Sequence, residues 1–278
     1  MKSSILLCLL ILCLAFSGCT HEKMEPEYSQ EETLVEESLQ PHIGALSTAK
    51  LQALDDGQVT WGPGREVDDQ NRPTACVALQ EEFGQYGAVF LTEEDGICLT
   101  FDEGYENGYT AGILDTLKEE EVSAVFFVTL DYAKREPDLI RRMIEEGHTV
   151  GNHTAYHPNM TEVSLEKAAE NIQVLHDYVL QEFGYEMYLF RNPEGAFSEQ
   201  TLALAQEMGY RSVLWSFAYN DWNVNDQPGE DTALKRLTGA LHPGAVYLLH
   251  AVSKTNHDIL GEWIRQTKAA GYSFVTLN

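Results

Sequence analysis

Short apolar segments alternate with longer amphipathic segments through most of the chain, and this alternation predicts strands followed by helices. The predicted strands span residues 97–101, 123–128, 148–152, 187–190, 211–215, 245–249 and 273–277. The predicted helices span residues 109–120, 137–146, 165–183, 199–208, 232–241 and 257–270. Gly147 and Gly184 follow two of these helices, as is typical of helix C-termini.

Strands that alternate with helices indicate an α/β fold whose parallel sheet is covered by helices. A barrel and an open doubly wound sheet both fit the pattern. A glycine-rich nucleotide-binding loop follows none of the predicted strands, which disfavours nucleotide binding. Residues 54–95 are less regular, and we expect them to wrap the outside of the sheet. We therefore predict one folded domain over residues 54–278.

The N-terminus has the pattern of an export signal. A positive start at Lys2 precedes an apolar run too short for an ordinary membrane span, and Cys19 follows small residues. Residues 1–18 resemble a bacterial lipoprotein signal peptide, although Phe16 stands where leucine is usual. We expect a lipidated Cys19, a flexible acidic tether over residues 19–53, and a location on the outer face of the cytoplasmic membrane. An ordinary secretory signal, giving a secreted protein, is the alternative.

Charge and cysteine content narrow the class of partner. A formal net charge of −26 argues against nucleic acid as a partner and against a basic membrane-binding face. Cys76 and Cys98 lie in the predicted domain. They could form a disulfide after export, or they could be two buried thiols, because Cys98 falls in an apolar strand pattern.

Candidate chemistry follows the ends of five predicted strands. The residues are Asp102 and Glu103, then His153 and His157, then Arg191, then Asp221 and Trp222, and finally His250. In a parallel barrel the carboxyl ends of all strands meet at one face, so these side chains would gather at one mouth. Two imidazoles four residues apart can bind one divalent metal. Each residue also has a purely structural interpretation, such as a helix N-cap for Asp102 or a core histidine for His250.

Five ordered segments resemble the motifs of polysaccharide deacetylases, carbohydrate esterase family 4. They are Thr100-Phe101-Asp102-Glu103-Gly104, His153-Thr154-Ala155-Tyr156-His157, Arg191-Asn192-Pro193-Glu194-Gly195, Asp221-Trp222 and Leu248-Leu249-His250. The resemblance runs from Ile97 to the C-terminus and is greatest to the delta-lactam-biosynthetic de-N-acetylases. It implies an irregular (β/α)7 barrel and an enzyme that removes acetyl groups from N-acetylated amino sugars of peptidoglycan, in that branch N-acetylmuramic acid of the spore cortex.

The resemblance also implies a metal centre. His153 and His157 would hold a divalent metal, zinc or alternatively cobalt or manganese, with Glu103 at the position of a third ligand. Asp102 would be the general base, and Arg191 would keep it ionised and oriented. The family usually has aspartate where Glu103 stands, so direct ligation, ligation through water and no ligation remain alternatives.

The remaining roles concern the leaving group and the substrate. His250 would be the general acid that protonates the sugar amine, and Asp221 would orient one of the site residues or tune its charge. We expect backbone N–H groups near His157 or in the loop after Arg191 to share the oxyanion. The predicted substrate-binding residues are Tyr156, Pro193, Gly195, Trp222 and Leu248.

A second departure concerns the substrate. The muramic-acid branch commonly has proline and arginine where this chain has Asn192 and Glu194. A carboxylate at Glu194 would repel the lactyl carboxylate of muramic acid. The alternatives are therefore a deacetylase of another acetylated polysaccharide, or a non-catalytic glycan-binding lipoprotein on the same fold.

Overall fold

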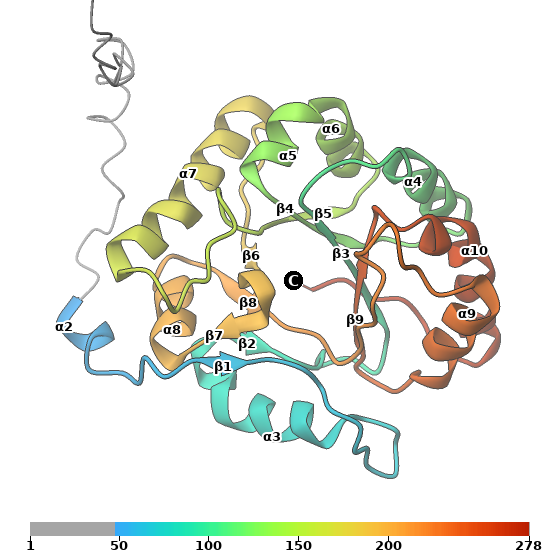
Figure 1. Ribbon diagram of the computed structural model, residues 1–278, viewed down its shortest axis with the longest axis horizontal. Helices are drawn as coiled ribbons and strands as arrows, with labels where there is room; N and C mark the ends of the chain where they lie inside the picture. Colours follow the sequence, from blue (N-terminus) through green and yellow to red (C-terminus); the bar gives the residue numbers. More distant parts are fainter. Residues whose placement is uncertain (1–47, 278) are drawn as a thin grey trace, which may run out of the picture. The chain divides into compact units, whose positions relative to one another are not determined.

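The computed structural model describes residues 48–277, and a parallel sheet of seven strands forms its centre (Figure 1). The strand order is β2-β8-β6-β5-β4-β3-β9, and each adjacent pair is parallel. The strands are β2 Ala88–Val89, β3 Cys98–Glu103, β4 Val125–Val128, β5 Thr149–Asn152, β6 Leu189–Phe190, β8 Arg211–Val213 and β9 Val246–His250. The predicted α/β class with a parallel sheet is confirmed.

The two edges of this sheet meet, so the sheet curls into an irregular barrel with helices outside (Figure 1). Beyond β2, the Thr92 N–H donates to the Gly244 carbonyl at 2.8 Å, just before β9. Beyond β8, Phe217 forms a parallel bridge with Tyr247 of β9. The barrel alternative predicted from sequence is thus the one that the structure adopts.

Helices cover the outside of the barrel, as expected for parallel strands joined by crossovers (Figure 1). They are α2 Thr48–Leu51, α3 Thr74–Phe83, α4 Thr110–Glu119, α5 Leu130–Arg135, α6 Pro137–Glu145, α7 Leu165–Phe183, α8 Glu199–Glu207, α9 Glu230–Gly239 and α10 Lys254–Ala269. The bounds of α7 agree with the prediction, because Ser164 caps its first turn and Gly184 ends it with a left-handed φ of 64°.

The prediction for the seventh strand was wrong. Residues 273–277 contain one isolated bridge, between Phe274 and Ile97, and no strand. The Leu277 carbonyl accepts a hydrogen bond from the Tyr188 hydroxyl at 3.1 Å, and Leu277 is buried. Ile97 and Tyr188 precede β3 and β6, so this segment crosses the amino ends of the strands and ends in the middle of the ring (Figure 1). Leu277 and Val275 pack with the interior cluster and Phe274 packs with the helix-side cluster, so the segment does not extend the sheet.

Residues 54–95, expected to wrap the outside, instead supply the missing strand β2 and the helix α3. They also supply β1 (Val59–Thr60), which pairs antiparallel with β7 (Ala196–Phe197) in a separate two-stranded sheet. Trp61 follows β1 and is buried, and its indole N–H donates to the Trp215 carbonyl at 2.9 Å. This part of the chain is therefore integral to the barrel.

Strand alternation separates the core into two clusters. Val125 and Phe127 of β4 belong to the cluster that includes other inward residues such as Cys98 and Leu248. Phe126 and Val128, which alternate with them, pack in the other cluster with residues of the surrounding helices. The same alternation on β3 decides which of its polar residues face the barrel interior.

Three further observations concern predictions made above. Cys76 and Cys98 are both buried and free, so the thiol alternative holds. Leu51 of α2 is buried, and the Gln200 side chain donates to its carbonyl at 3.0 Å, so folded structure begins a few residues before position 54. Within residues 48–277, every helix is too short or too polar to cross a membrane. The predicted signal, Cys19 and most of the tether lie outside the described residues.

Candidate active site

A groove of about 790 Å³ opens at the carboxyl ends of the strands. The residues that line it are Gly62, Pro63, Asp102, His153, His157, Glu194, Gly195, Trp215, Ala218, Tyr219, Asn220, Trp222, Leu248 and His250. An adjoining hollow shares Asp102, the histidines and Trp222, and adds Tyr105 and Val224 among others. The tertiary structure therefore gathers candidate residues of all five motifs.

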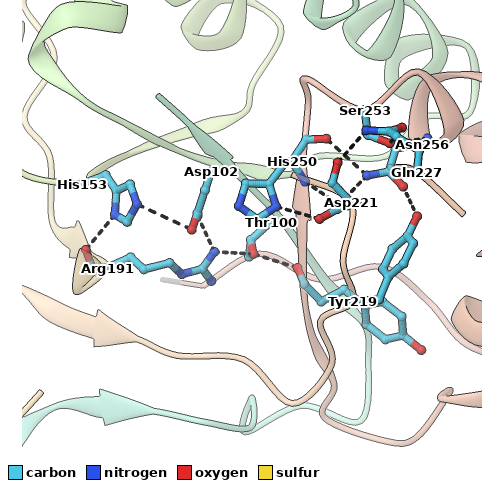
Figure 2. Close-up of polar contacts among 11 residues, drawn as sticks. Thr100, Asp102, His153, Arg191, Tyr219, Asp221, Gln227, His250, Ser253 and Asn256 are labelled. Carbon is cyan, nitrogen blue, oxygen red and sulfur yellow. Dashed lines mark hydrogen bonds and ion pairs between the residues drawn. The ribbon is translucent and has the colours of Figure 1, made fainter. Parts of the chain in front are cut away.

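Asp102 lies on the inward side of β3 and forms a buried ion pair with Arg191. Arg191 Nη1 donates to Asp102 Oδ1 at 2.7 Å and to Thr100 Oγ1 at 2.8 Å (Figure 2). Burial alone would raise the pKa of Asp102, but the charge and the hydrogen bond of Arg191 outweigh it and lower that pKa. Asp102 is thus held ionised, as a general base must be.

Arg191 is fully buried, and its guanidinium is held on several sides. Its Nε donates to the Val213 carbonyl at 2.9 Å, and its Cζ lies 4.1 Å from the centre of the Phe127 ring. These contacts fix the guanidinium in one orientation, so Arg191 acts on the site through Asp102.

His153 and His157 leave β5 and stand at the mouth with ring centroids 4.8 Å apart. His153 Nδ1 lies 2.9 Å from the Arg191 carbonyl, and its Nε2 lies 3.6 Å from Asp102 Oδ2 (Figure 2). Burial lowers the pKa of His153 to about 4, so the ring is neutral at physiological pH. If Nδ1 carries the proton and donates to that carbonyl, Nε2 presents a lone pair toward the groove.

The turn that carries the two histidines is strained but well supported. Thr154 and His157 both have left-handed φ values, 68° and 54°, which are uncommon for residues other than glycine. The His157 N–H donates to Thr154 Oγ1 at 2.9 Å, and the Ala155 N–H donates to the Asn171 carbonyl of α7 at 2.9 Å. The turn therefore brings His157 back beside His153, which a continued extended strand would not do.

His250 ends β9 and is paired with Asp221 through two contacts. Its ring Nδ1 lies 2.8 Å from Asp221 Oδ1, and its backbone N–H donates to Asp221 Oδ2 at 2.8 Å (Figure 2). Burial alone would lower the pKa of His250, but the hydrogen bond and charge of fully buried Asp221 raise it. The protonated imidazole is thereby stabilised, which suits a general acid.

A polar network behind Asp221 was not predicted from sequence. Asn256 Nδ2 donates to Asp221 Oδ2 at 2.6 Å, Gln227 Nε2 donates to the Asp221 carbonyl at 2.7 Å, and Tyr219 donates to Asn256 (Figure 2). Asn256 lies on α10 and Gln227 lies in the loop before α9. Only the proximity of Gln227 to Asp221 in the chain offered any signal for these residues.

Glu103 lies on the opposite side of β3 from Asp102. It is fully buried on the helix side of the sheet, the side to which Leu99 and Phe101 also point. Neither of its carboxyl oxygens has a hydrogen-bond partner among the described residues. Burial, with the nearby charges of Glu106 and Asp102, raises the pKa of Glu103 well above the usual value and so favours its neutral form. It does not line the groove.

The predicted substrate-binding residues divide into two groups. Trp222, Gly195 and Leu248 line the groove, and Trp222 is 59% exposed. Tyr156 is 71% exposed but lines neither hollow, and Pro193 is buried behind the surface. Tyr105, which the motif comparison left without a role, is half-exposed and lines the mouth.

Three of the backbone donors expected for the oxyanion are engaged within their own turns. The Tyr156 N–H donates to Asn171 Oδ1 at 3.3 Å, the His157 N–H to Thr154, and the Gly195 N–H to the Asn192 carbonyl at 3.2 Å. For the other N–H groups of these two loops, a role at the oxyanion stays a prediction.

The donor set fits a divalent metal held by two imidazoles. His153 is neutral, has Nδ1 beside a carbonyl, and faces His157 across the mouth. Within residues 48–277 there is no group of three or more histidine, cysteine, aspartate or glutamate side chains placed to hold one ion. The structure thus supports the two histidines as ligands and gives no support for Glu103.

The chain belongs to the polysaccharide deacetylase family. The polysaccharide deacetylase family model matches residues 91–213. The chain is 39% identical to peptidoglycan-N-acetylmuramic acid deacetylase PdaA of Bacillus subtilis, over 84% of this chain and 90% of the relative. It is 34% identical to a peptidoglycan-N-acetylglucosamine deacetylase of Bacillus cereus, over 65% of this chain and 66% of the relative.

Solved structures show the same fold. The structure of Bacillus subtilis PdaA, described as a family 4 carbohydrate esterase, superposes with a TM-score of 0.75 at 38% identity, covering 80% of this chain and 95% of that one. The irregular barrel predicted from the motifs is therefore confirmed, and with it membership of a family of carbohydrate-active hydrolases.

Proposed function

We propose that this protein is a metal-dependent N-deacetylase of cell-wall glycan, which hydrolyses the acetamide of N-acetylated amino sugars in peptidoglycan. The observation that carries the proposal is the convergence on one groove of Asp102 paired with Arg191, two imidazoles, and His250 paired with Asp221. The named relatives that act on peptidoglycan support the choice of substrate.

His153 and His157 would hold the metal, and zinc is the ion that we favour among zinc, cobalt and manganese. When bound, the ion supplies Lewis-acid polarisation of the acetamide carbonyl and makes water easier to deprotonate. Asp102 takes the proton of the attacking water on Oδ2, because Oδ1 is occupied by Arg191.

His250 completes the reaction at the other side of the groove. Asp221 accepts from Nδ1, so Nε2 is the atom that can donate a proton to the nitrogen of the breaking C–N bond. An amine leaves readily only after it is protonated, and Asp221 raises the pKa of His250, which favours the charged form of this donor. Trp222 and Leu248 form an apolar wall on the groove.

We also propose that the protein is exported and anchored by a lipid on Cys19. The apolar run before Cys19 and the acidic stretch after it support this proposal. Labelling of cells with a radioactive fatty acid tests it, since Cys19→Ala should lose the label and a secreted protein would never acquire it.

Acetate release from purified peptidoglycan tests the activity. We expect release by the zinc-loaded protein, a loss of about 100-fold or more for Asp102→Asn, and an equally large loss for His153→Ala. His257→Ala is the matched control, because His257 lies on α10 away from the groove. Acetate release by Asp102→Asn at the wild-type rate would contradict the assigned base. A protein that binds peptidoglycan but releases no acetate would favour the glycan-binding alternative.

A further inference from the structure

Glu194 is a groove carboxylate that the proposed reaction does not use. It lines the same groove as His157 and His250, and its side chain is exposed. Within the described part of the chain, Glu194 makes neither a hydrogen bond nor an ion pair. Its charge is therefore available to whatever enters the groove.

The turn that carries Glu194 is held rigidly. Glu194 has a left-handed backbone with φ 60° and ψ 4°. The backbone N–H of Trp61 donates to the Gly195 carbonyl at 3.0 Å. A Cβ on Gly195 would lie 2.5 Å from the Trp215 ring, so the turn packs tightly against that ring. The hydrogen bond from Trp61 and the Trp215 ring beside Gly195 together fix the path of the turn. The Glu194 carboxylate is therefore attached at a fixed point of the groove wall.

In the described groove the cationic form of His250 is already paired with Asp221, and lysine and arginine do not offset the charge of Glu194. Lysine and arginine are absent from the residues that line the groove and the adjoining hollow. Arg191 is fully buried and already paired with Asp102. The chain as a whole has a formal net charge of −26, so the surrounding field is also negative.

Muramic acid and glucosamine differ in the substituent next to the reacting acetamide. The acetamide is on C2 in both sugars, and muramic acid carries a lactyl ether on the adjacent C3. When the stem peptide is attached, the lactyl group is an uncharged amide whose N–H can donate to a carboxylate. When the stem peptide has been removed, the lactyl group ends in a free carboxylate, which Glu194 would repel.

We propose, on the basis of the function proposed above, that Glu194 selects N-acetylated sugars that carry no free lactyl carboxylate on C3. Muramic acid with a free lactyl carboxylate is then a poor substrate, whereas glucosamine and peptide-substituted muramic acid are accepted. In a reaction sequence, the deacetylation would precede any amidase reaction that exposes the lactyl carboxylate. The relatives do not decide this point, since their names include both sugars.

A pair of substrates that differ only in charge tests the proposal. Glycan strands stripped of stem peptides by an amidase carry free lactyl carboxylates, and a portion is converted to carboxamides with carbodiimide and ammonia. For the zinc-loaded wild-type protein we expect kcat/KM for deacetylation of the muramic acid residues to be about 10-fold or more higher on the carboxamide. Mass spectrometry of the digested strands counts deacetylated muramic acid separately, because glucosamine in the same strands also releases acetate. The preference should shrink as salt rises, because exposed charges are screened. Acetate release from an N-acetylglucosamine oligosaccharide shows whether the protein also accepts N-acetylglucosamine.

Variants assign the preference to Glu194. Glu194→Gln should accept both glycans about equally, and Glu194→Lys should prefer the carboxylate. Glu186→Gln is the matched control, because Glu186 is an exposed carboxylate outside the groove. The metal is the same in every variant, so its charge cancels from the comparison.

The outcomes separate this proposal from the activity itself. If the wild-type protein favours the free carboxylate, or treats both glycans alike, the selection is refuted while deacetylation stands. If a preference for the carboxamide persists in Glu194→Gln, Glu194 is not its cause. Absence of acetate from all three substrates refutes the function on which this proposal rests.

Discussion

Arg191 and Asp102 form an ion pair in the interior of the barrel, with Nη1 and Oδ1 2.7 Å apart and the guanidinium fully buried. Burial removes both charges from water, and only their mutual attraction and hydrogen bond offset that desolvation cost. Removing one partner therefore leaves the other as an uncompensated buried charge. Arg191 therefore both keeps Asp102 ionised and contributes to the stability of the barrel interior.

Arg191→Met should therefore affect both stability and pH dependence. We expect the free energy of unfolding near pH 7 to fall by about 3–5 kcal/mol, because Asp102 is left buried without its partner. Its pKa should rise, since burial then acts with less opposition. The acid limb of the pH profile of kcat/KM should move to higher pH. Denaturant melts and initial rates measure the two effects.

The sign of the pH dependence offers a check on this pair. The lowered pKa of Asp102 means that the pair stabilises the wild-type fold above the unfolded-state pKa of about 4. That contribution is lost as the pH falls through the folded-state pKa, so wild type and variant should converge in acid. Arg135→Met, which breaks the exposed pair with Asp131, should cost no more than about 1 kcal/mol. Equal losses for the two variants would argue against the buried pair as described.

Asp221→Asn should shift the basic limb of the pH profile. Asp221 raises the pKa of His250, so its neutralisation lowers that pKa and moves the basic limb to lower pH. We also expect kcat to fall by roughly 10²–10⁴-fold, since the general acid is no longer charged or oriented. NMR titration of the His250 ring measures the pKa directly. A basic limb that stays in place would mean that another group donates the proton.

Glu103→Gln should stabilise the protein at neutral pH. A carboxyl with a raised folded-state pKa holds its proton in the fold and loses it on unfolding, so stability falls as the pH rises above the unfolded value. The amide does not titrate. The advantage of the variant should therefore grow by up to about 1.4 kcal/mol per pH unit above pH 4.3, until the folded-state pKa is reached. Glu207→Gln, an exposed control on α8, should show no such trend.

Metal affinity separates the two histidines from Glu103. Titration calorimetry with zinc should show a loss of affinity of at least about 100-fold for His153→Ala or His157→Ala. Glu103→Gln should bind zinc as the wild type does, because its side chain points away from the groove. A large loss for Glu103→Gln would show instead that β3 rearranges to bring this carboxylate to the ion.

Most of the fold and part of the site could be predicted from the sequence. The helix of residues 165–183 has local signals at both ends, a capping Ser164 and a terminal Gly184, and its bounds were correct. The prediction of a strand at residues 273–277 was wrong, because the same apolar pattern occurs in a sheet strand and in a segment that packs across the amino ends of the strands. The two-residue strand β2 was missed because so short an element has no periodicity of its own.

What the sequence by itself determined was the order of the elements and the identity of the reactive groups, since both follow from local patterns and residue chemistry. Only the tertiary structure decided which of those groups share a space. Asp102 and Glu103 are adjacent in the chain, yet the pleat sends one to Arg191 in the barrel interior and the other to the helix side. Asp221 and His250 meet because the loop after β8 and the end of β9 come together at the same mouth, and chain separation gives no indication of that contact.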